Sequence, residues 1–447
     1  MTAMEILRPG DAGYDESATA FMGSGTPALV IRPRDPDEVA AAVTDAARGG
    51  VAISVRSGGH SLVGHSTNDG GMVLDLRQLA GIEVLDAERR LVRIGAGSTW
   101  AAVAAALAPY GWGLTSGDTT TVGVGGLTLG GGIGWMVRRY GLTVDNLRSA
   151  RLVTADGRLL TASADEHPDL FWALRGGGGN FGVVVDFDFV VHETPSVHFG
   201  TISYGMDDPA GLLTRWRDAM RGAPDELSST AALIPRFPGA PELAQVLVCY
   251  AGAPGAPVAE ADAAIEPLLE LGTVVEASVT ERPYAEILEE PMRPPGISAY
   301  GRNILVSPLG GDVIAAAVAA HRGTAPTAVA IRSLGGAFGR VPPDATAFAH
   351  RDAEAMVQCA VLIPEAAPQS EVAAALTPWS EVAGHGTGTY ANFHGSVTAE
   401  DLTAAYPRDT LARLAEVKRA YDPDNVFRHN LNIEPAAAGP ETEGPGA

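Results

Sequence analysis

Hydrophobic and polar residues alternate along the first part of the chain in strand-like runs that flank helix-like ones. Apolar runs at 28–34 and 51–55 enclose a helical pattern at 38–48. Asp35 stands at the N-cap position of that helix and Pro36 at its first position. The pattern therefore predicts a β-α-β unit whose helix stops at the glycine pair 49–50.

A hairpin over 152–160 is indicated just as clearly, because Asp156-Gly157 suits a type I′ turn between two apolar runs. Similar patterns predict strands at 72–76 and 183–191, a hairpin over 82–95 and an alanine-rich helix at 101–109.

The character of the chain changes near residues 194–197. From 198 to 390, strands such as 245–250 alternate with alanine-rich helices around 256–270, 311–321 and 370–376. We interpret this part as a second domain, inserted into a first one that comprises 1–197 and 391–433. The predicted fold class is α+β. The tail 434–447 is rich in Pro, Gly, Ala and Glu and is expected to be disordered.

Composition excludes several classes of function. The net charge of −22 argues against nucleic acids and anionic membranes as partners. Two cysteines, Cys249 and Cys359, supply neither a disulfide scaffold nor a multi-cysteine zinc site, and we expect no metal. Because no signal peptide and no transmembrane run is visible, we expect a cytoplasmic protein, either a monomer or a homodimer.

Glycine runs carry the candidate chemistry. Arg56-Ser-Gly-Gly-His60-Ser61 follows the apolar run 51–55, and a second run spans 123–134. Such backbone can approach a phosphate closely, because glycine has no Cβ. A third string at 177–182 satisfies the GxGxxG dinucleotide expression, but a strand-like run follows it where that motif needs a helix. Each run alone could be a simple turn, whereas together they indicate a large, flat, phosphate-bearing ligand.

Several strings together resemble one family. The chain is similar to the FAD-linked oxidases of the vanillyl-alcohol-oxidase/p-cresol-methylhydroxylase superfamily, in the berberine-bridge-enzyme-like and 6-hydroxy-D-nicotine-oxidase-like branch. The resemblance covers 28–433 and implies a two-part FAD-binding domain of the p-cresol-methylhydroxylase type, with an inserted substrate domain built on an antiparallel sheet covered by helices. The matching strings are 55–61 with 64–71, 123–134 with 139–146, 169–182, 390–392, and 421–427 leading to 430–433.

The resemblance implies FAD bonded through a ring nitrogen of His60 to the flavin 8α-methyl group. A structural histidine is the alternative. Some relatives carry a second link from a cysteine, and Thr119 stands at that position here, so a monocovalent flavin is expected. The implied cofactor-binding residues are Arg56, Ser57, Gly58, Gly59, His60, Ser61, Gly64, His65, Gly117, Asp118, Val122, Gly123, Gly125, Gly126, Gly130, Gly131, Gly132, Gly134, Val183, Asn392, Asn430 and Asn432.

Tyr390 matches the tyrosine that removes a substrate proton in several relatives, so the resemblance makes it the candidate catalytic base. A phenol needs a lowered pKa, or proton release concerted with hydride transfer, to act at neutral pH. A packed aromatic is the alternative. Secondary candidates are Tyr250, Tyr284, Tyr300 and Arg302, while His350-Arg351 is interpreted as mainly structural.

The resemblance thus implies an FAD-dependent oxidase that removes hydride from a C–H next to an O–H or N–H of a small organic substrate. Dioxygen would be the acceptor and hydrogen peroxide the product. Two alternatives stay open: a dehydrogenase of the same fold with another acceptor, and a drug-binding or resistance flavoprotein.

Overall fold

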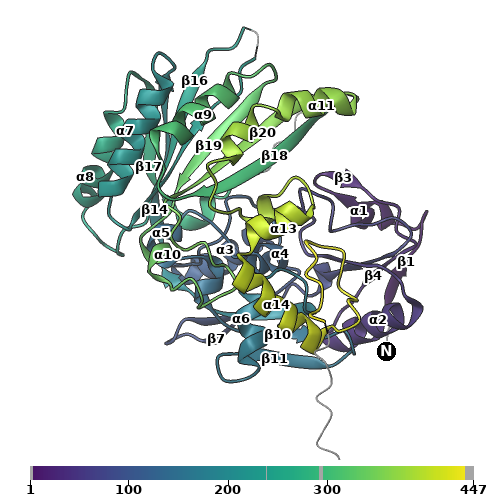
Figure 1. The fold of residues 1–447 in the computed structure, drawn as a ribbon. Coiled ribbons are helices and arrows are strands. Elements are labelled where there is room, and N and C mark those ends of the chain that lie inside the picture. Colours follow the sequence, from purple (N-terminus) through teal and green to yellow (C-terminus); the bar gives the residue numbers. More distant parts are fainter. Residues whose placement is uncertain (1–3, 238, 291–294, 438–447) are drawn as a thin grey trace, which may run out of the picture.

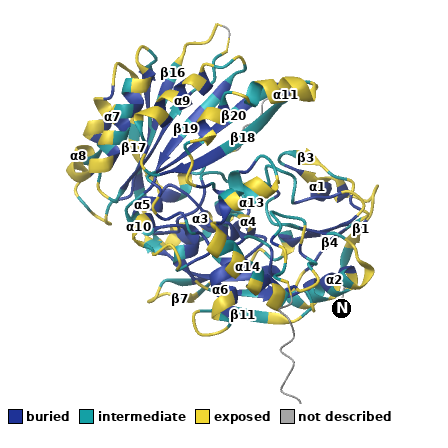
Figure 2. Cartoon of the chain, viewed as in Figure 1, coloured by how far each residue is buried: buried dark blue, intermediate teal, exposed yellow. Residues whose placement is uncertain are grey.

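A computed structural model describes residues 4–237, 239–290 and 295–437. Three sheets carry most of the structure (Figure 1). Two smaller sheets lie in the N-terminal part of the chain, and one seven-stranded sheet lies in its middle part. Figure 2 shows that the strands are largely buried, whereas the helices around the large sheet expose their outer faces.

The first sheet contains the predicted β-α-β unit. Its strand order is β1 (Glu5–Leu7), β4 (Leu29–Arg32), β6 (Met72–Asp75) and β5 (Ile53–Arg56), with β4, β6 and β5 parallel. Helix α2 (Pro36–Gly49) connects β4 to β5. The prediction for its start is confirmed, because the Asp35 carboxylate accepts a hydrogen bond from the backbone N–H of Glu38 at 2.9 Å. Gly50, at φ 63°, ends the helix.

The second sheet is antiparallel and has the order β11 (Leu159–Ser163), β10 (Leu147–Val153), β12 (Val183–Val190), β8 (Leu91–Gly95) and β7 (Ile82–Asp86). Both predicted hairpins are present. Strand β12 also confirms that no helix follows the glycines at 177–182.

The type I′ turn predicted at Asp156-Gly157 is wrong. Such a turn needs positive φ at both residues, and of the two only Gly157 has it, at 83°. The connection is longer, with the backbone N–H of Gly157 donating to the carbonyl of Thr154 at 2.9 Å. The Asp156 carboxylate accepts from the Thr154 hydroxyl at 2.6 Å and from the N–H of Arg158 at 3.3 Å. These side-chain bonds hold the wider turn.

The large sheet is entirely antiparallel. Helices pack along it (Figure 1): α7 (Pro209–Gly222) on β15, α8 (Val258–Leu269) on β16, α9 (Gly311–His321) on β19, α11 (Gln369–Leu376) on β20 and α12 (Trp379–Ala383) on β18. The helices predicted around 256–270, 311–321 and 370–376 are therefore confirmed. Its strand order is β17 (Val274–Pro283), β14 (Ser196–Gly205), β16 (Leu243–Tyr250), β15 (Leu227–Leu233), β19 (Thr327–Ser333), β20 (Ala355–Pro364) and β18 (Ile297–Val306).

A small apolar cluster joins the large sheet to the N-terminal part of the chain. Trp135 and Met136, which follow the second glycine run, pack with Phe199 of β14 and Cys249 of β16. Trp135 and Phe199 meet edge to face with their ring centroids 5.2 Å apart. The segment after the glycine run is thus fixed against the sheet.

The C-terminal segment returns to the N-terminal part of the chain through α13 (Ala399–Ala405) and α14 (Arg408–Tyr421). The buried amide of Asn180 accepts from the N–H of Ile433 at 3.0 Å and donates to the carbonyl of Leu431 at 3.2 Å. The predicted disordered tail differs at its start, since the N–H of Ala436 donates to the carbonyl of Ala415 at 3.0 Å. Residues 438–447 lie outside the described part of the chain.

Shorter elements complete the fold and connect the sheets. The two helices that matter for the site are α4, which lies within the second glycine run, and α5, which follows it. The short elements are α1 (Tyr14–Ala18), β2 (Thr19–Ala20), β3 (Gly23–Ser24), α3 (Trp100–Leu107), β9 (Trp112–Gly113), α4 (Val124–Leu129), α5 (Val137–Tyr140), α6 (Pro168–Leu174), β13 (His192–Glu193) and α10 (Ala337–Arg340).

Replacing Lys418 by Met is expected to lower the free energy of unfolding by about 3–5 kcal/mol, because it leaves buried acceptors without their donor. The fully buried Lys418 ammonium donates to the Asp422 carboxylate at 2.6 Å and to the carbonyls of Asn180 and Phe427 at 2.8 and 2.9 Å. Denaturant unfolding measures the loss. The neighbouring Arg419→Met, which alters an exposed side chain, is the control and should change stability little.

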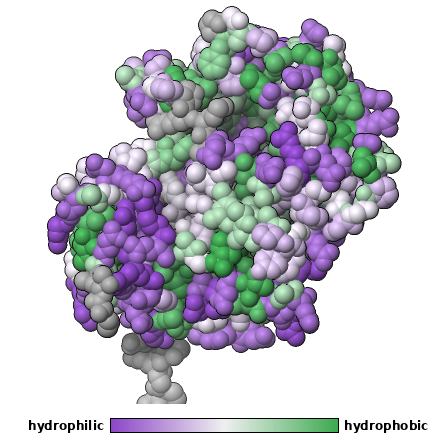
Figure 3. All heavy atoms as spheres, turned by 180° about the vertical axis from the view of Figure 1, so that it is seen from behind, coloured by the Kyte–Doolittle hydropathy of each residue, from purple (hydrophilic) through white to green (hydrophobic). Residues whose placement is uncertain are grey.

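On the face drawn in Figure 3, hydrophilic residues cover much of the surface and hydrophobic ones form smaller patches between them. Within the described ranges, no helix combines the length and apolarity that crossing a membrane requires.

Candidate active site

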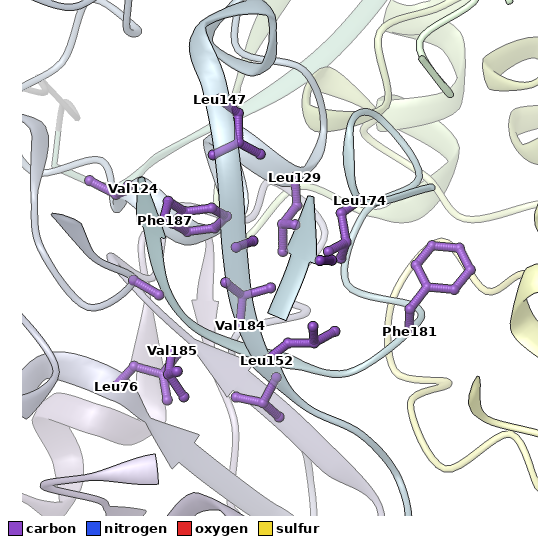
Figure 4. Packing of buried hydrophobic residues seen from close by; sticks show 14 of the residues in the cluster. Leu76, Val124, Leu129, Leu147, Leu152, Leu174, Phe181, Val184, Val185 and Phe187 are labelled. Atoms are coloured by element: carbon purple, nitrogen blue, oxygen red, sulfur yellow. The ribbon is translucent and has the colours of Figure 1, made fainter. Parts of the chain in front are cut away.

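A cavity of about 430 Å³ lies between the glycine runs and the C-terminal segment. Its walls come from the segments 57–66, 117–129, 178–184, 390–397 and 427–431. Leu76, Leu129 and Val184 line the cavity and also belong to the main hydrophobic core (Figure 4). The floor of the cavity is therefore the packed core itself, which makes it rigid.

The first two glycine runs touch each other through their backbones. A Cβ at Gly58 would collide with the backbone nitrogen of Gly123, and a Cβ at Gly123 would collide with that of Gly58. Ser57 reinforces this contact, since its hydroxyl donates to the carbonyl of Ala96 at 2.6 Å and accepts from the N–H of Gly125 at 3.2 Å. The two runs thus form one continuous wall of backbone.

His60 is held at the rim of that wall. Its ring stacks on Phe21, with centroids 4.8 Å apart and planes at 17°, and its Nε2 lies 2.8 Å from the Thr121 hydroxyl. Burial and the nearby Arg56 guanidinium lower the pKa of His60, so the imidazole is neutral. Its Nδ1 has no hydrogen-bond partner within the described ranges of the chain.

Asn303 of β18 positions Tyr390. The buried Asn303 amide accepts from the N–H of Tyr390 at 2.7 Å and donates to its carbonyl at 3.1 Å. The Tyr390 ring packs edge to face on Phe393, with centroids 5.2 Å apart. A strand of the large sheet therefore fixes the backbone of a residue that lies beyond that sheet in the sequence.

The Tyr390 hydroxyl oxygen faces two N–H donors. The backbone N–H of Gly132 donates to it at 3.1 Å and the Asn392 amide at 2.9 Å. The carbonyls of Gly126 and Leu127 accept from the same Asn392 amide nitrogen, which settles its orientation. Burial raises the pKa of Tyr390 above its ordinary value, and the hydrogen bonds and the charge of Arg332 oppose that rise. Of the two conditions named for a phenol that acts at neutral pH, the lowered pKa is not met here.

Asp118 and Arg332 form an ion pair at the cavity wall. Arg332 Nη2 donates to the Asp118 carboxylate at 2.7 Å, and its guanidinium lies over the Trp135 ring, 5.0 Å from the centroid. Arg332 keeps the pKa of Asp118 below its ordinary value even though burial alone would raise it. Asp118 was expected at the site, whereas sequence patterns gave no signal for Arg332 or Asn303, which lie on strands of the inserted sheet.

Comparison with known proteins decides the family. Residues 27–163 match the FAD binding domain model and residues 389–434 match the berberine and berberine-like model. The chain is 34% identical to (R)-6-hydroxynicotine oxidase of Paenarthrobacter nicotinovorans over 452 residues, which cover 96% of each chain. It belongs to the berberine-bridge-enzyme-like FAD-linked oxidoreductases.

Solved structures of this family share the fold. The crystal structure of 6-hydroxy-D-nicotine oxidase from Arthrobacter nicotinovorans matches with a TM-score of 0.86 and 32% identity, over 97% of this chain and 98% of that one. Glucooligosaccharide oxidase from Acremonium strictum, whose FAD is 6-S-cysteinyl and 8α-N1-histidyl, matches with a TM-score of 0.84 and 25% identity, over 97% and 98%. The family resemblance and the fold class expected from the sequence are confirmed.

The cavity of this FAD-linked oxidoreductase fits the cofactor of its family. Gly126 and Gly179 line it with ordinary φ values, and a Cβ at either would meet nothing within 4 Å. Neither the backbone conformation nor a close neighbour requires glycine at these two positions. The free space at both can therefore hold a ligand. Buried polar atoms without a partner in the described structure also lie on the lining residues, namely Ser66 Oγ, His394 Nδ1 and Asn430 Oδ1.

Most of the predicted cofactor residues line this cavity together. The lining ones are Ser57, Gly58, Gly59, His60, Ser61, His65, Gly117, Asp118, Val122, Gly123, Gly125, Gly126, Asn392 and Asn430, together with Tyr390 and Thr119. The others lie beside it. Arg56, Gly64, Gly130, Gly131, Gly132, Gly134, Val183 and Asn432 do not line it.

Two of the residues outside the lining have clear reasons for their position. Strand residues alternate between faces, so Val184 rather than Val183 points to the cavity. Arg56 packs beneath Gly59, and its Nη1 donates to the carbonyl of Thr19 at 2.7 Å. The position of Val183 in the matching sequence string does not specify which face of the strand its side chain occupies.

The secondary base candidates Tyr250, Tyr284, Tyr300 and Arg302 are not among the cavity residues. The hydroxyl of Tyr284, for example, donates to the carbonyl of Leu114 at 2.9 Å.

The pair His350-Arg351 takes part in hydrogen bonds and ion pairs of the fold. Arg351 donates to the Asp145 carboxylate at 2.7 Å, and His350 Nε2 lies 3.1 Å from the carbonyls of Ala404 and Ala405. Within the described ranges, no group of three or more His, Cys, Asp or Glu side chains could hold a metal ion.

Replacing Gly179 by Leu is expected to leave the protein folded but to remove most of its bound flavin, because the side chain fills cavity space that the fold does not use. The ratio of visible to ultraviolet absorbance after purification measures flavin content. Gly222→Leu is the matched control, since a Cβ there also meets nothing within 4 Å but lies at the end of α7, outside the cavity. Full flavin content in Gly179→Leu would contradict this use of the cavity.

Proposed function

We propose that the chain is an FAD-dependent oxidase that removes hydride from a C–H next to an O–H or N–H of a small organic substrate, with dioxygen as acceptor and hydrogen peroxide as product. The observation that best supports this proposal is the position of the Tyr390 hydroxyl. Two N–H groups donate to it, at a cavity that His60 also lines. The relatives named above are oxidases of small molecules, which supports this assignment.

FAD bound here would supply the hydride acceptor and pass the electrons on to dioxygen. The backbone wall around Gly58 and Gly123 would hold its diphosphate, since it brings N–H groups close without side chains in the way. We further propose a single covalent link through Nδ1 of His60. The Thr121 hydroxyl engages Nε2 and so leaves Nδ1 for the bond.

The absence of a second link rests on Thr119. Its hydroxyl donates to the Asp118 carboxylate at 3.2 Å, and no thiol is available, because Cys249 and Cys359 are both buried elsewhere in the fold. Acremonium glucooligosaccharide oxidase has a cysteinyl link in addition to the histidyl one. Flavin tethered only at His60 is the proposal for this chain.

Tyr390 acts as the base in its phenolate form in this proposal. The N–H groups of Gly132 and Asn392 already point at the Tyr390 oxygen. They therefore stabilise the negative charge of the phenolate without a rearrangement. The phenolate would take the O–H or N–H proton of the substrate as the hydride leaves the neighbouring carbon. The substrate domain, 198–390, is proposed to cover this side of the cavity.

Stoichiometry tests the proposal. A panel of small alcohols and amines, including 6-hydroxynicotine and oligosaccharides, is incubated with the purified protein in air, and substrate loss, oxygen uptake and peroxide are measured together. One peroxide for each substrate oxidised supports the oxidase. Oxidation that needs an added acceptor and yields no peroxide favours the dehydrogenase, and stoichiometric capture of a ligand without turnover favours the drug-binding flavoprotein.

A further inference from the structure

A second cavity, of about 550 Å³, lies away from the site described above and shares no lining residue with it. Its walls come from Arg138 of α5, from α7, and from the segment 333–340 that leads from β19 into α10, together with Leu309 and Glu354. No part of the proposed function uses this cavity.

Arginine dominates the polar lining of this second cavity. Arg138, Arg217, Arg221 and Arg340 line it, against two carboxylates, Asp225 and Glu354. In a chain with a net charge of −22, a cavity with an excess of positive charge is a local reversal of the surrounding field. That reversal would attract an anion.

Three of the four arginines already have carboxylate partners. Arg340 meets Asp225 at 2.6 Å, Arg221 meets Glu354 at 2.6 Å, and Arg217 meets Asp218 at 2.7 Å. The side chains of Arg340 and Arg221 are 63% and 46% exposed, so these pairs contribute little and can rearrange. Arg217, Arg221 and Arg340 together are called the arginine rim below.

Arg138 is different, because it is only 7% exposed and has no carboxylate partner within the described ranges. Its Nη1 and Nη2 donate to the carbonyls of Leu334 and Ala223 at 2.6 and 3.1 Å, while its Nε is buried without a hydrogen-bond partner. The charge of Asp225 acts on Arg138 without a direct ion pair, so a buried guanidinium with one unpaired N–H remains open to an anion. Gly335, at φ 90°, lets the chain pass beside this group where a Cβ would press on Nη1.

The rest of the lining is apolar. Trp216, Met220, Leu309 and Leu334 are all buried and line the same cavity. Charged groups over an apolar floor suit a ligand that has one anionic end and a hydrophobic body.

We propose that this cavity binds a small organic anion, whose carboxylate or phosphate group pairs with Arg138 and the arginine rim and whose apolar body covers Trp216 and Met220. The assignment is independent of the oxidase proposal. Arg138 lies three residues after Trp135, and Ser333 follows Arg332, so a ligand here would contact the segments that carry Trp135 and the arginine paired with Asp118.

Calorimetric titration of the flavin-containing protein tests this site. The probes are 1-naphthoate and 1-naphthyl phosphate, which distinguish a carboxylate from a phosphate ligand, with 1-naphthylmethanol as the uncharged analogue, all at constant ionic strength in chloride. We expect saturable binding of one molecule of at least one anionic probe, and binding of the uncharged analogue that is about tenfold weaker or more.

Variants locate the binding. Arg340→Gln and Arg138→Gln should each weaken the better probe about tenfold or more, whereas Arg89→Gln, at a side chain 83% exposed beyond the end of β7, should leave binding unchanged. If Arg138→Gln fails to fold, Arg217→Gln takes its place. The proposal is overturned if neither anionic probe saturates below about 10 mM, if the uncharged analogue binds equally well, or if all variants behave like Arg89→Gln.

Discussion

Tyr390→Phe is expected to slow flavin reduction by about 10²–10⁴-fold while substrate binding stays within about threefold, because the change removes the base but keeps the ring. Rapid-mixing absorbance of the flavin, with any substrate that yields peroxide, measures the step. Because burial raises the pKa of Tyr390 above its ordinary value, the phenolate fraction of the unmodified protein still grows on the alkaline side of neutrality. Its kcat/KM should therefore rise about tenfold per pH unit on the alkaline side of neutrality, and the variant should lack this limb.

Tyr406→Phe is the matched control for that experiment. Tyr406 is also a buried tyrosine, and its hydroxyl donates to the carbonyl of Gly176 at 3.1 Å, outside the lining of the first cavity. It should change stability but not the pH profile. A Tyr390→Phe variant with an unchanged reduction rate would remove Tyr390 from the mechanism.

His60→Ala is expected to abolish covalent attachment of the flavin completely. In the unmodified protein, yellow colour should stay in the pellet after acid precipitation, and intact mass should include one FAD. In the variant the colour should move to the supernatant, because the bond-forming nitrogen is gone while the backbone wall around Gly58 remains. Thr121→Val is expected to slow attachment without abolishing it, since the hydroxyl only fixes the ring nitrogen that it faces.

His385→Ala, at a half-buried histidine near α12, is the control and should keep its flavin in the pellet. Colour that remains in the pellet of His60→Ala would place the bond on another residue. Colour that is released even from the unmodified protein would leave FAD bound without a covalent link.

Much of the local structure was predictable from single segments. Asp35 and Pro36 start α2 as expected, because capping depends only on groups within one turn of helix. The sequence also predicts that no helix follows Gly182, because the apolar, β-branched run at 183–190 favours a strand. Strand β12 confirms this. The hairpin at 152–160 formed where predicted, but its turn type depended on how the Thr154 and Asp156 side chains paired.

The site shows where such prediction ends. The strings around His60 and Tyr390 identified segments that do line one cavity. They did not specify which face of its strand Val183 occupies. They also gave no sign of Asn303 or Arg332, because the strands that carry these residues reach the site only when the large sheet has formed. The sequence left the direction of the Tyr390 pKa shift open, because burial, which raises that pKa, is a property of the packed molecule.

Residue patterns alone are enough to identify the family, the glycine-rich backbone, the histidine at its rim and the tyrosine near the C-terminal return. These features depend on residue types at short spacings, which survive in the linear chain. Three contacts come from the folded molecule alone: Gly58 lies against Gly123, Asn303 bonds to the backbone of Tyr390, and Arg138 is buried with its Nε unpaired. Those contacts join residues that are distant in sequence, so they arise from sheet register and packing, which no local pattern specifies.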